Sequence, residues 1–173
     1  MKSDYYILKP YNSQDIIDAV ERACLLAGRQ KNNLYVHTFG RFEVYDKDRV
    51  IDFSNAKAKE LLALCIDHVG GEVSMDECAA KLWGNRPYDE KVKNLYRKAV
   101  SYLKRLLAEY GHEDVFINKR GSCCVAIQHI ICDYYQYIIP EQYGNLEYGY
   151  SGEYMIQYEW AREKEAKLLE LNK

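Results

Sequence analysis

Two kinds of periodicity alternate along the 173-residue chain. Short apolar or alternating runs in 34–53 and 115–127 predict strands, three in the first range and a hairpin in the second. Between them, apolar residues recur at helical spacing in 54–71, 74–84 and 91–110. The expected order is a three-stranded antiparallel sheet, three helices and a β-hairpin. This order predicts an α+β fold of the winged helix-turn-helix type, with flanking helices.

Residues that favour helix ends punctuate this pattern. We expect Ser54 to cap the first helix and the glycine pair that begins at Gly70 to stop it. Ser74 and Glu77 have the spacing of a capping box at the start of the second helix, and Gly84 follows its last apolar residue. The second helix is therefore expected to be short.

The third helix, 91–110, sorts its side chains by charge. Its apolar residues fall on one side, within an arc of roughly 120°: Val92, Leu95, Tyr96, Ala99, Leu103, Leu106 and Leu107. The opposite side carries Lys93, Asn94, Arg97, Lys98, Ser101, Lys104 and Arg105. No acidic residue occurs from Lys91 to Ala108, so like charges lie beside one another at an energetic cost that a polyanion would offset. A chance basic face that is simply solvated is the alternative.

The expected hairpin, 115–127, carries charge of the same sign at its turn. Lys119 and Arg120 precede Gly121, which permits a tight bend. A hairpin tip of this kind could reach across a phosphate backbone into a minor groove. A Lys-Arg-Gly turn alone is more often a solvated loop, and it gains weight here from the basic helix.

Composition narrows the class of protein. A formal net charge of −2, 48% hydrophobic and 29% charged residues are ordinary for a soluble globular chain. No run approaches the roughly 18 apolar residues of a membrane span, and the start of the chain lacks a signal-peptide core, so we expect a cytoplasmic protein that does not enter a membrane. The cysteines show no C-x-x-C spacing and the histidines no metal spacing, so we expect reduced thiols, no metal and no cofactor.

Several stretches together resemble a known family. They are "TFGRFEVY", "AKAKELLALCIDHVGGEVSMDECAAKLWG", "NLYRKAVSYLKRLL" and "ICDYYQYI". Over residues 34 to about 139 the chain resembles the winged-helix effector domain of OmpR/PhoB-type response regulators, most nearly the antibiotic-regulatory-protein (SARP) branch. The resemblance implies a sequence-specific DNA-binding transcription regulator whose third helix lies in the major groove.

The resemblance also implies roles for individual residues. Those expected to face the groove are Asn94, Arg97, Lys98, Ser101, Lys104 and Arg105, while Trp83 is expected to anchor the packing. The wing of the family usually continues from Arg-Gly into an aromatic residue. Here Ser122, Cys123 and Cys124 follow Gly121 instead, so the detail of the wing contact departs from the family pattern.

The flanking segments resemble parts of larger regulators. Residues 1–30 resemble the last strand and helix of a receiver domain, with Lys9-Pro10 in the place of the Lys-Pro pair beside its phosphorylation site. Residues 148–171 resemble the first helix of the helical activator domain that follows the winged domain in the same branch. The domains expected are thus 1–30, 34–139 and 140–173. We expect the last to dock through Tyr154, Tyr158, Ala161 and Leu168, or to dimerise.

The sequence leaves two functions open. In the first, the chain is the DNA-binding effector part of a two-component response regulator. The residues expected to read bases are Asn94, Arg97 and Ser101. Those expected to bind phosphates are Lys93, Lys98, Lys104, Lys119 and Arg120. RNA polymerase and a second copy of the chain are its further expected partners. In the second, the winged helix binds an acidic protein partner. No phosphate-loop, zinc-hydrolase, nucleophile-elbow or dinucleotide motif is present, so we do not expect an enzyme.

Overall fold

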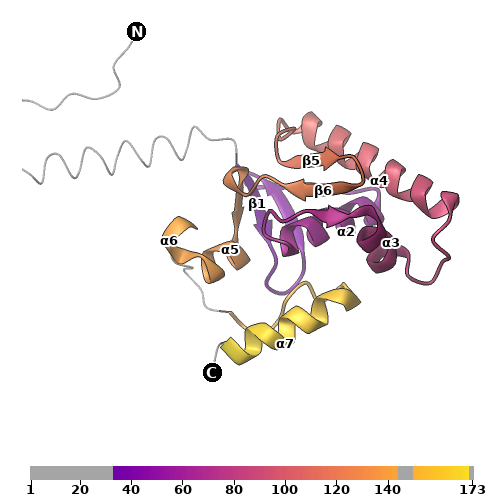
Figure 1. Cartoon of the computed structure of the whole chain (residues 1–173). Helices are drawn as coiled ribbons and strands as arrows, with labels where there is room; N and C mark the ends of the chain where they lie inside the picture. Colours follow the sequence, from indigo (N-terminus) through magenta and orange to yellow (C-terminus); the bar gives the residue numbers. More distant parts are fainter. Residues whose placement is uncertain (1–32, 144–149, 172–173) are drawn as a thin grey trace, which may run out of the picture. The chain divides into compact units, whose positions relative to one another are not determined.

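The computed structural model describes residues 33–143 and 150–171, which belong to one compact unit spanning 33–173 (Figure 1). The strand and helix expected in 1–30 lie outside the described residues. The described part of the chain is α+β, with two small sheets and helices packed between and beside them.

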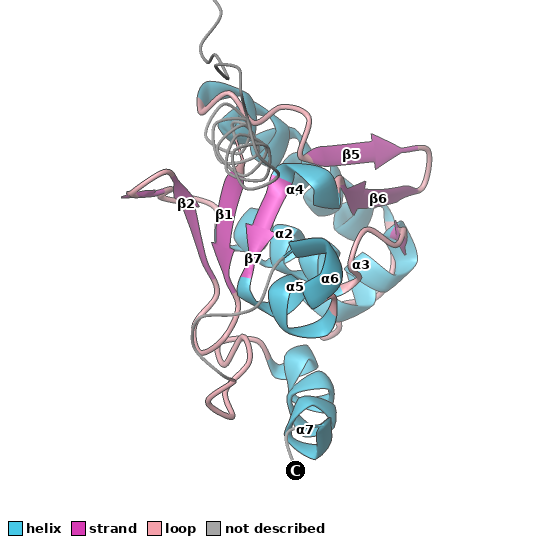
Figure 2. Cartoon of the chain, turned by 90° about the vertical axis from the view of Figure 1, so that its left-hand side faces the viewer, coloured by secondary structure: helices cyan, strands magenta, loops and turns pink. Residues whose placement is uncertain are grey.

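The first sheet has four strands rather than the expected three. Its strands are β1 (Leu34–His37), β2 (Glu43–Asp46), β3 (Arg49–Val50) and β7 (Ile130–Cys132), in the order β3-β2-β1-β7. The first three form the expected antiparallel meander, and β7 pairs parallel to β1 (Figure 2). The prediction of a three-stranded antiparallel sheet was therefore incomplete, because β7 arrives from nearly a hundred residues further along the chain.

A single carboxylate ties β7 to the end of β1. Asp133 follows β7 directly and accepts hydrogen bonds from the backbone N–H of Thr38 at 2.9 Å and of Phe39 at 3.0 Å. The Thr38 hydroxyl donates to the same carboxylate at 2.6 Å. These bonds satisfy backbone donors that would otherwise be left unpaired in a partly buried place.

Three helices follow the first meander. They are α2 (Ala56–Asp67), α3 (Met75–Trp83) and α4 (Glu90–Glu109). The Oγ of Ser74 accepts from the backbone N–H of Glu77, as the capping box predicts. The cap expected at Ser54 was wrong, because the side chain of Asn55 accepts from the N–H of Ala58 instead. Both residue types make good caps, and the pattern alone does not choose between neighbours.

The expected wing is present as part of a second sheet. Strands β5 (Phe116–Lys119) and β6 (Ser122–Val125) form an antiparallel hairpin, and the short strand β4 (Val73–Ser74) pairs with β6 on its other side. Gly121 adopts φ +83° at the hairpin turn, which a side chain would disfavour. Because β4 leads directly into α3, the wing is fixed to the helix-turn-helix by main-chain hydrogen bonds.

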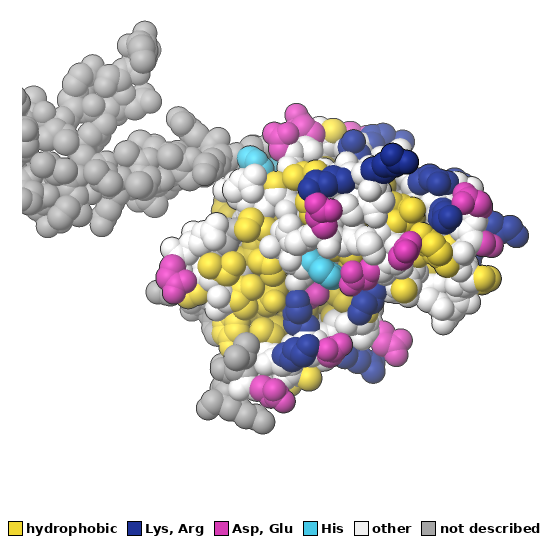
Figure 3. Space-filling model, in the orientation of Figure 1, with side chains coloured by type: hydrophobic (Ala, Val, Ile, Leu, Met, Phe, Trp, Pro, Cys, Tyr) yellow, Lys and Arg dark blue, Asp and Glu magenta, His cyan; other side chains and the backbone are white. Residues whose placement is uncertain are grey.

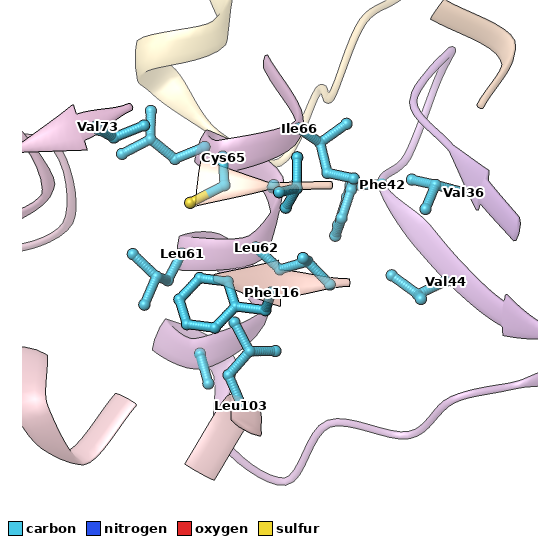
Figure 4. Packing of buried hydrophobic residues seen from close by; sticks show 14 of the residues in the cluster. Val36, Phe42, Val44, Leu61, Leu62, Cys65, Ile66, Val73, Leu103 and Phe116 are labelled. Carbon is cyan, nitrogen blue, oxygen red and sulfur yellow. The ribbon is translucent and has the colours of Figure 1, made fainter. Parts of the chain in front are cut away.

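The core surrounds α2. Figure 4 shows Leu62 and Ile66 of this helix near Val36, Phe42 and Val44 of the first sheet and its β1–β2 loop. From α4, the residues that are buried are Val92, Tyr96, Ala99, Val100, Leu103, Leu106 and Leu107, while Leu95 is half-buried. The helical period thus identified the buried face of α4 well, and missed only the buried Val100.

A histidine and a group of cysteines lie in the interior of the unit. His112 is buried, with its Nε2 3.1 Å from Asp46 Oδ1. Cys123 of β6 contacts Cys65 of α2 at 3.4 Å and Cys78 of α3 at 3.9 Å, measured between sulfur atoms. The cysteines in the described part of the chain are free thiols, as expected. Hydrogen bonding to Cys123, and then burial, raise the pKa of Cys65 and Cys78, which keeps them protonated.

The C-terminal segment docks on α2, although it is less helical than expected. After α5 (Asp133–Ile138) and α6 (Pro140–Tyr143), only η2 (Glu159–Ala161) and α7 (Arg162–Leu171) are helical in the described part of the range expected as one helix. Tyr154, Ala161 and Leu168 are buried as expected, and Tyr158 is half-buried. Met155 at φ 43° and Gly152 at φ 96° break the chain direction before η2.

Candidate nucleic-acid interface

The basic side chains of α4 form one exposed face beside the wing. The same period that buries one side of the helix leaves the other to solvent, and Asp89 caps the helix by accepting from the N–H groups of Lys91 and Val92. In Figure 3, Lys and Arg side chains gather over α4 and the β5–β6 hairpin, at the upper right of the molecule. The predicted contact residues that are exposed are Asn94, Arg97, Lys98, Ser101, Lys104, Arg105, Lys119 and Arg120. Lys93 is half-buried.

A groove of about 520 Å³ separates the helix from the wing. Its walls are polar: Arg97, Ser101 and Lys104 line it from α4, and Asn118, Lys119 and Arg120 line it from the hairpin. Met75, Tyr96, Val100 and Gly121 also line it. The fold therefore brings the middle of the basic helix and the tip of the wing into one concave surface.

Some predicted residues lie outside this groove, and one groove residue was not predicted. Lys93, Asn94, Lys98 and Arg105 are on α4 but do not line it. Asn118 was missed, although it precedes the Lys-Arg pair at the hairpin turn and carries an amide that can donate and accept hydrogen bonds. Its polar side chain beside the turn could have indicated this position, but Asn118 carries no charge, and the sequence prediction of the wing contacts was based on cations.

Glu90, the first residue of α4, is bonded to two of the predicted contact residues. Its Oε1 lies 3.0 Å from Lys93 Nζ and its Oε2 lies 3.6 Å from Arg97 Nη1. Arg97 Nη1 also donates to Asn94 Oδ1 at 2.8 Å. The hydrogen bond and charge of Lys93, with a smaller contribution from Arg97, hold the pKa of the Glu90 carboxyl below its ordinary value.

Glu72 makes a similar arrangement on the wing. It precedes β4, and its carboxylate pairs with Lys119 Nζ and accepts from the Ser122 hydroxyl at 2.7 Å. Hydrogen bonding to Lys119 and then to Ser122 lowers the pKa of the Glu72 carboxyl, and the same contact raises the pKa of Lys119. Both groups are therefore charged at neutral pH.

The remaining cations of the surface differ in their partners. Arg105 Nε lies 3.7 Å from Glu109 Oε1 at the far end of α4. Lys98, Lys104 and Arg120 make no ion pair with any residue that the structure describes. Lys98 and Lys104 of α4 and Arg120 of the hairpin tip thus carry positive charge that no described acidic residue pairs with, as does Lys91, whereas Lys93, Arg97 and Arg105 are paired with Glu90 or Glu109.

Other kinds of site find little support in the described residues. Within 33–143 and 150–171, no group of three or more His, Cys, Asp or Glu side chains is arranged to hold a metal ion. No helix among those residues is both long and apolar enough to cross a membrane. A second groove, of about 600 Å³, lies between α2, the end of α3 and η2, and its lining mixes Lys57, Lys81 and Arg86 with Glu60 and Glu159.

Comparison with known proteins gives a likeness to a solved structure. No family model matches the sequence, and no curated protein matches it. Among solved structures, the fold is similar to that of Mycobacterium tuberculosis EmbR, solved in complex with a low-affinity phosphopeptide, with a TM-score of 0.52 and 18% sequence identity. The likeness covers 61% of this chain and 28% of the EmbR chain, so this chain spans well under half the length of that protein. At this identity the likeness concerns the fold.

Proposed function

We propose that this chain is a sequence-specific DNA-binding transcription regulator, the effector part of a cytoplasmic two-component response regulator without catalytic activity. The observation that carries the proposal is the concave basic surface formed by α4 and the wing, where Arg97, Lys104 and Arg120 line one groove. The fold likeness to EmbR and the sequence resemblance to the SARP branch support it.

The proposed roles follow from position on this surface. Asn94, Arg97 and Ser101 read base edges from α4 in the major groove, because amide, guanidinium and hydroxyl groups make the directional hydrogen bonds that distinguish bases. The residues that bind phosphates are Lys93, Lys98, Lys104, Arg105, Lys119 and Arg120. The chain as a whole carries a net charge of −2, so attraction to DNA has to come from this local surface. RNA polymerase and a second copy of the chain, on repeated half-sites, complete the proposed partners.

The test is enrichment from a pool of random duplexes at two salt concentrations. We expect one motif to be enriched, and affinity for it to fall roughly 10³-fold or more between about 50 and 200 mM salt, as six or more phosphate contacts require. Arg97→Ala should cost about 1–3 kcal/mol and relax specificity at one base pair. A double variant that also carries Arg105→Ala should lose more affinity.

The matched control removes two cations from α7, with Arg162→Ala and Lys167→Ala. Both residues are exposed, and α7 lies at the other end of the unit from α4 and the wing (Figure 1). The control should leave the enriched motif and its affinity unchanged. No enrichment by the wild-type chain, or equal losses in both double variants, would contradict the proposal.

A second candidate function is protein binding by the same surface. EmbR, of which 28% is similar in fold to this chain, was solved in complex with a low-affinity phosphopeptide. The cations Lys98, Lys104 and Arg120, which have no ion-pair partner among the described residues, would suit an acidic partner. Weak, sequence-independent DNA binding beside tight binding of an acidic protein would favour this candidate over the first.

A further inference from the structure

The groove between α4 and the wing has cations on both of its walls. Arg97 and Lys104 line it from α4, and Lys119 and Arg120 line it from the hairpin. None of the residues that line this groove is acidic. A partner that enters the groove therefore meets positive charge from two directions, which favours an anion.

Asn118 is the uncharged polar residue that the wing contributes to this groove, and the register of the hairpin shows which way it points. It lies opposite Cys123 of β6, and residues paired in an antiparallel ladder project from the same face. Cys123 is buried, with its sulfur close to those of Cys65 in α2 and Cys78 in α3. The side chain of Asn118 therefore projects from the face of the hairpin that is turned toward the helices.

The neighbouring residues of β5 agree with this orientation. Lys119 lies opposite Ser122, and both of their side chains contact Glu72, so the next pair projects from the other face. Phe116, two residues before Asn118 on the face turned toward the helices, is 3% exposed. Along this face of β5, the apolar core thus ends at Phe116, and an exposed amide that lines the groove follows it.

The Asn118 amide has hydrogen-bonding capacity that the described residues do not use. Arg97, Ser101 and Lys104 form the opposite wall of the groove, yet the side chain of Asn118 makes no hydrogen bond with any residue that the structure describes. Its amide nitrogen carries two N–H donors. Asparagine side chains are among the groups that donate to phosphate oxygens in protein–DNA complexes.

The shape of a DNA duplex indicates what would occupy the groove. In the proposed function, α4 lies in the major groove of the duplex and the wing reaches toward the minor groove. The two grooves of a duplex are separated by a sugar-phosphate strand, so this strand would pass between α4 and the wing. A base edge would instead lie in front of α4.

We propose that Asn118 is a phosphate-binding residue, which donates a hydrogen bond from its amide to the DNA strand held between α4 and the wing. This inference rests on the proposed function. The contact carries no base preference, because every sequence presents a phosphate at this place. Since the amide is uncharged, the contact also neutralises no phosphate and releases no counterion.

The first test measures the affinity of Asn118→Ala for a duplex with the enriched motif and for its single-base variants. We expect about tenfold weaker binding to the motif, from the loss of one hydrogen bond to a charged group. The order of the single-base variants should stay the same, as a phosphate contact requires. The slope of log K against log salt should also stay the same.

A second variant, Asn118→Lys, places a cation at the same position and gives a readout that a merely structural role would not change. If a phosphate lies beside residue 118, the new cation neutralises it, and the salt slope should steepen by about 0.9. The matched controls are Gln128→Ala and Gln128→Lys. Gln128 carries the same type of amide, is exposed in η1 (Ile127–His129) and does not line the groove. Both controls should keep the affinity and the slope of the wild-type chain.

The outcomes separate this inference from the proposed function. If the wild-type chain enriches a motif and Asn118→Ala binds it equally well, the inference is overturned and the proposed function stands. The same holds if Asn118→Lys changes the slope no more than Gln128→Lys does. A loss confined to one base pair of the motif would also overturn the inference, because Asn118 would then read a base. If the wild-type chain binds no duplex, both are overturned.

Discussion

A buried carboxylate contributes to the attachment of the C-terminal segment, and removal of a single hydroxyl tests how much. Asp67, at the end of α2, is 8% exposed, accepts from the Tyr154 hydroxyl at 2.8 Å and pairs with Lys164 Nζ at 3.0 Å. Tyr154→Phe removes the hydroxyl and keeps the ring, which packs against Tyr134 and Phe39. Hydrogen bonds to charged groups contribute about 1.5–3 kcal/mol. Because Asp67 keeps Lys164, we expect a loss near the lower limit, about 1.5 kcal/mol.

Equilibrium urea unfolding of the whole chain, followed by circular dichroism, measures this loss. Tyr137→Phe is the matched control: Tyr137 belongs to the same aromatic cluster, contacts Phe39 and Tyr150, and makes no hydroxyl hydrogen bond among the described residues. It should change the free energy of unfolding by less than about 0.5 kcal/mol. In a double-mutant cycle with Asp67→Ala, the coupling energy should be about 1 kcal/mol or more. Equal effects of the two Tyr→Phe changes, or no coupling, would refute the reasoning.

Two further predictions concern titration and helix capping. Burial raises the pKa of Tyr134 to about 12, and burial together with Asp67 raises the pKa of Tyr154 well above its ordinary value, so the unfolded chain releases these protons first as pH rises above about 10. The stabilisation from these two tyrosines should therefore be fully present below pH 10. Above pH 10 the free energy of unfolding should fall by about 1.4 kcal/mol per pH unit per tyrosine. Urea midpoints measured against pH test this, and midpoints that stay constant up to pH 11 would contradict it. Asn55→Ala should cost about 1 kcal/mol in thermal unfolding, because it removes the cap of α2. Ser54→Ala should cost less, because the Ser54 hydroxyl contacts the Tyr102 hydroxyl and no helix N–H among the described residues. A larger loss in Ser54→Ala than in Asn55→Ala would instead support Ser54 as the cap, as the sequence predicted.

The helices of the winged domain could be predicted because their information is local. The apolar period of α4 depends on residues three and four apart, and the cap of α3 depends on Ser74 and Glu77, three apart. Strand β7 could not be found in this way. It is three residues long, and its pairing with β1 depends on Asp133 reaching the N–H groups of Thr38 and Phe39 from a distant part of the sequence.

In the C-terminal segment, the local pattern predicted more helix than the structure has. Tyrosines and apolar residues in 148–171 occur at intervals that a helix would bury, yet Tyr154 forms an isolated β-bridge with Phe39. The backbone N–H of Met155 donates to the carbonyl of Thr38 at 2.8 Å, so contacts with the first sheet replace the helical hydrogen bonds here. Spacing identified which side chains are buried, but tertiary contacts decided the backbone conformation that buries them.

The sequence predicted the cations of the candidate interface but not the acidic residues that pair with some of them. The interior of α4, from Lys91 to Ala108, contains no acidic residue. The acids that contact its cations are Glu90 and Glu109, one residue beyond each limit, and their ion pairs involve the ends of the helix. The repulsion between like charges is therefore already offset at Lys93, Arg97 and Arg105, whereas Lys91, Lys98 and Lys104 have no ion-pair partner among the described residues. Lys98 and Lys104 are exposed, and Lys104 lines the groove beside the wing. Fewer cations than the sequence suggested are therefore left without an acidic partner, and replacing Lys98 and Lys104 tests DNA binding most directly.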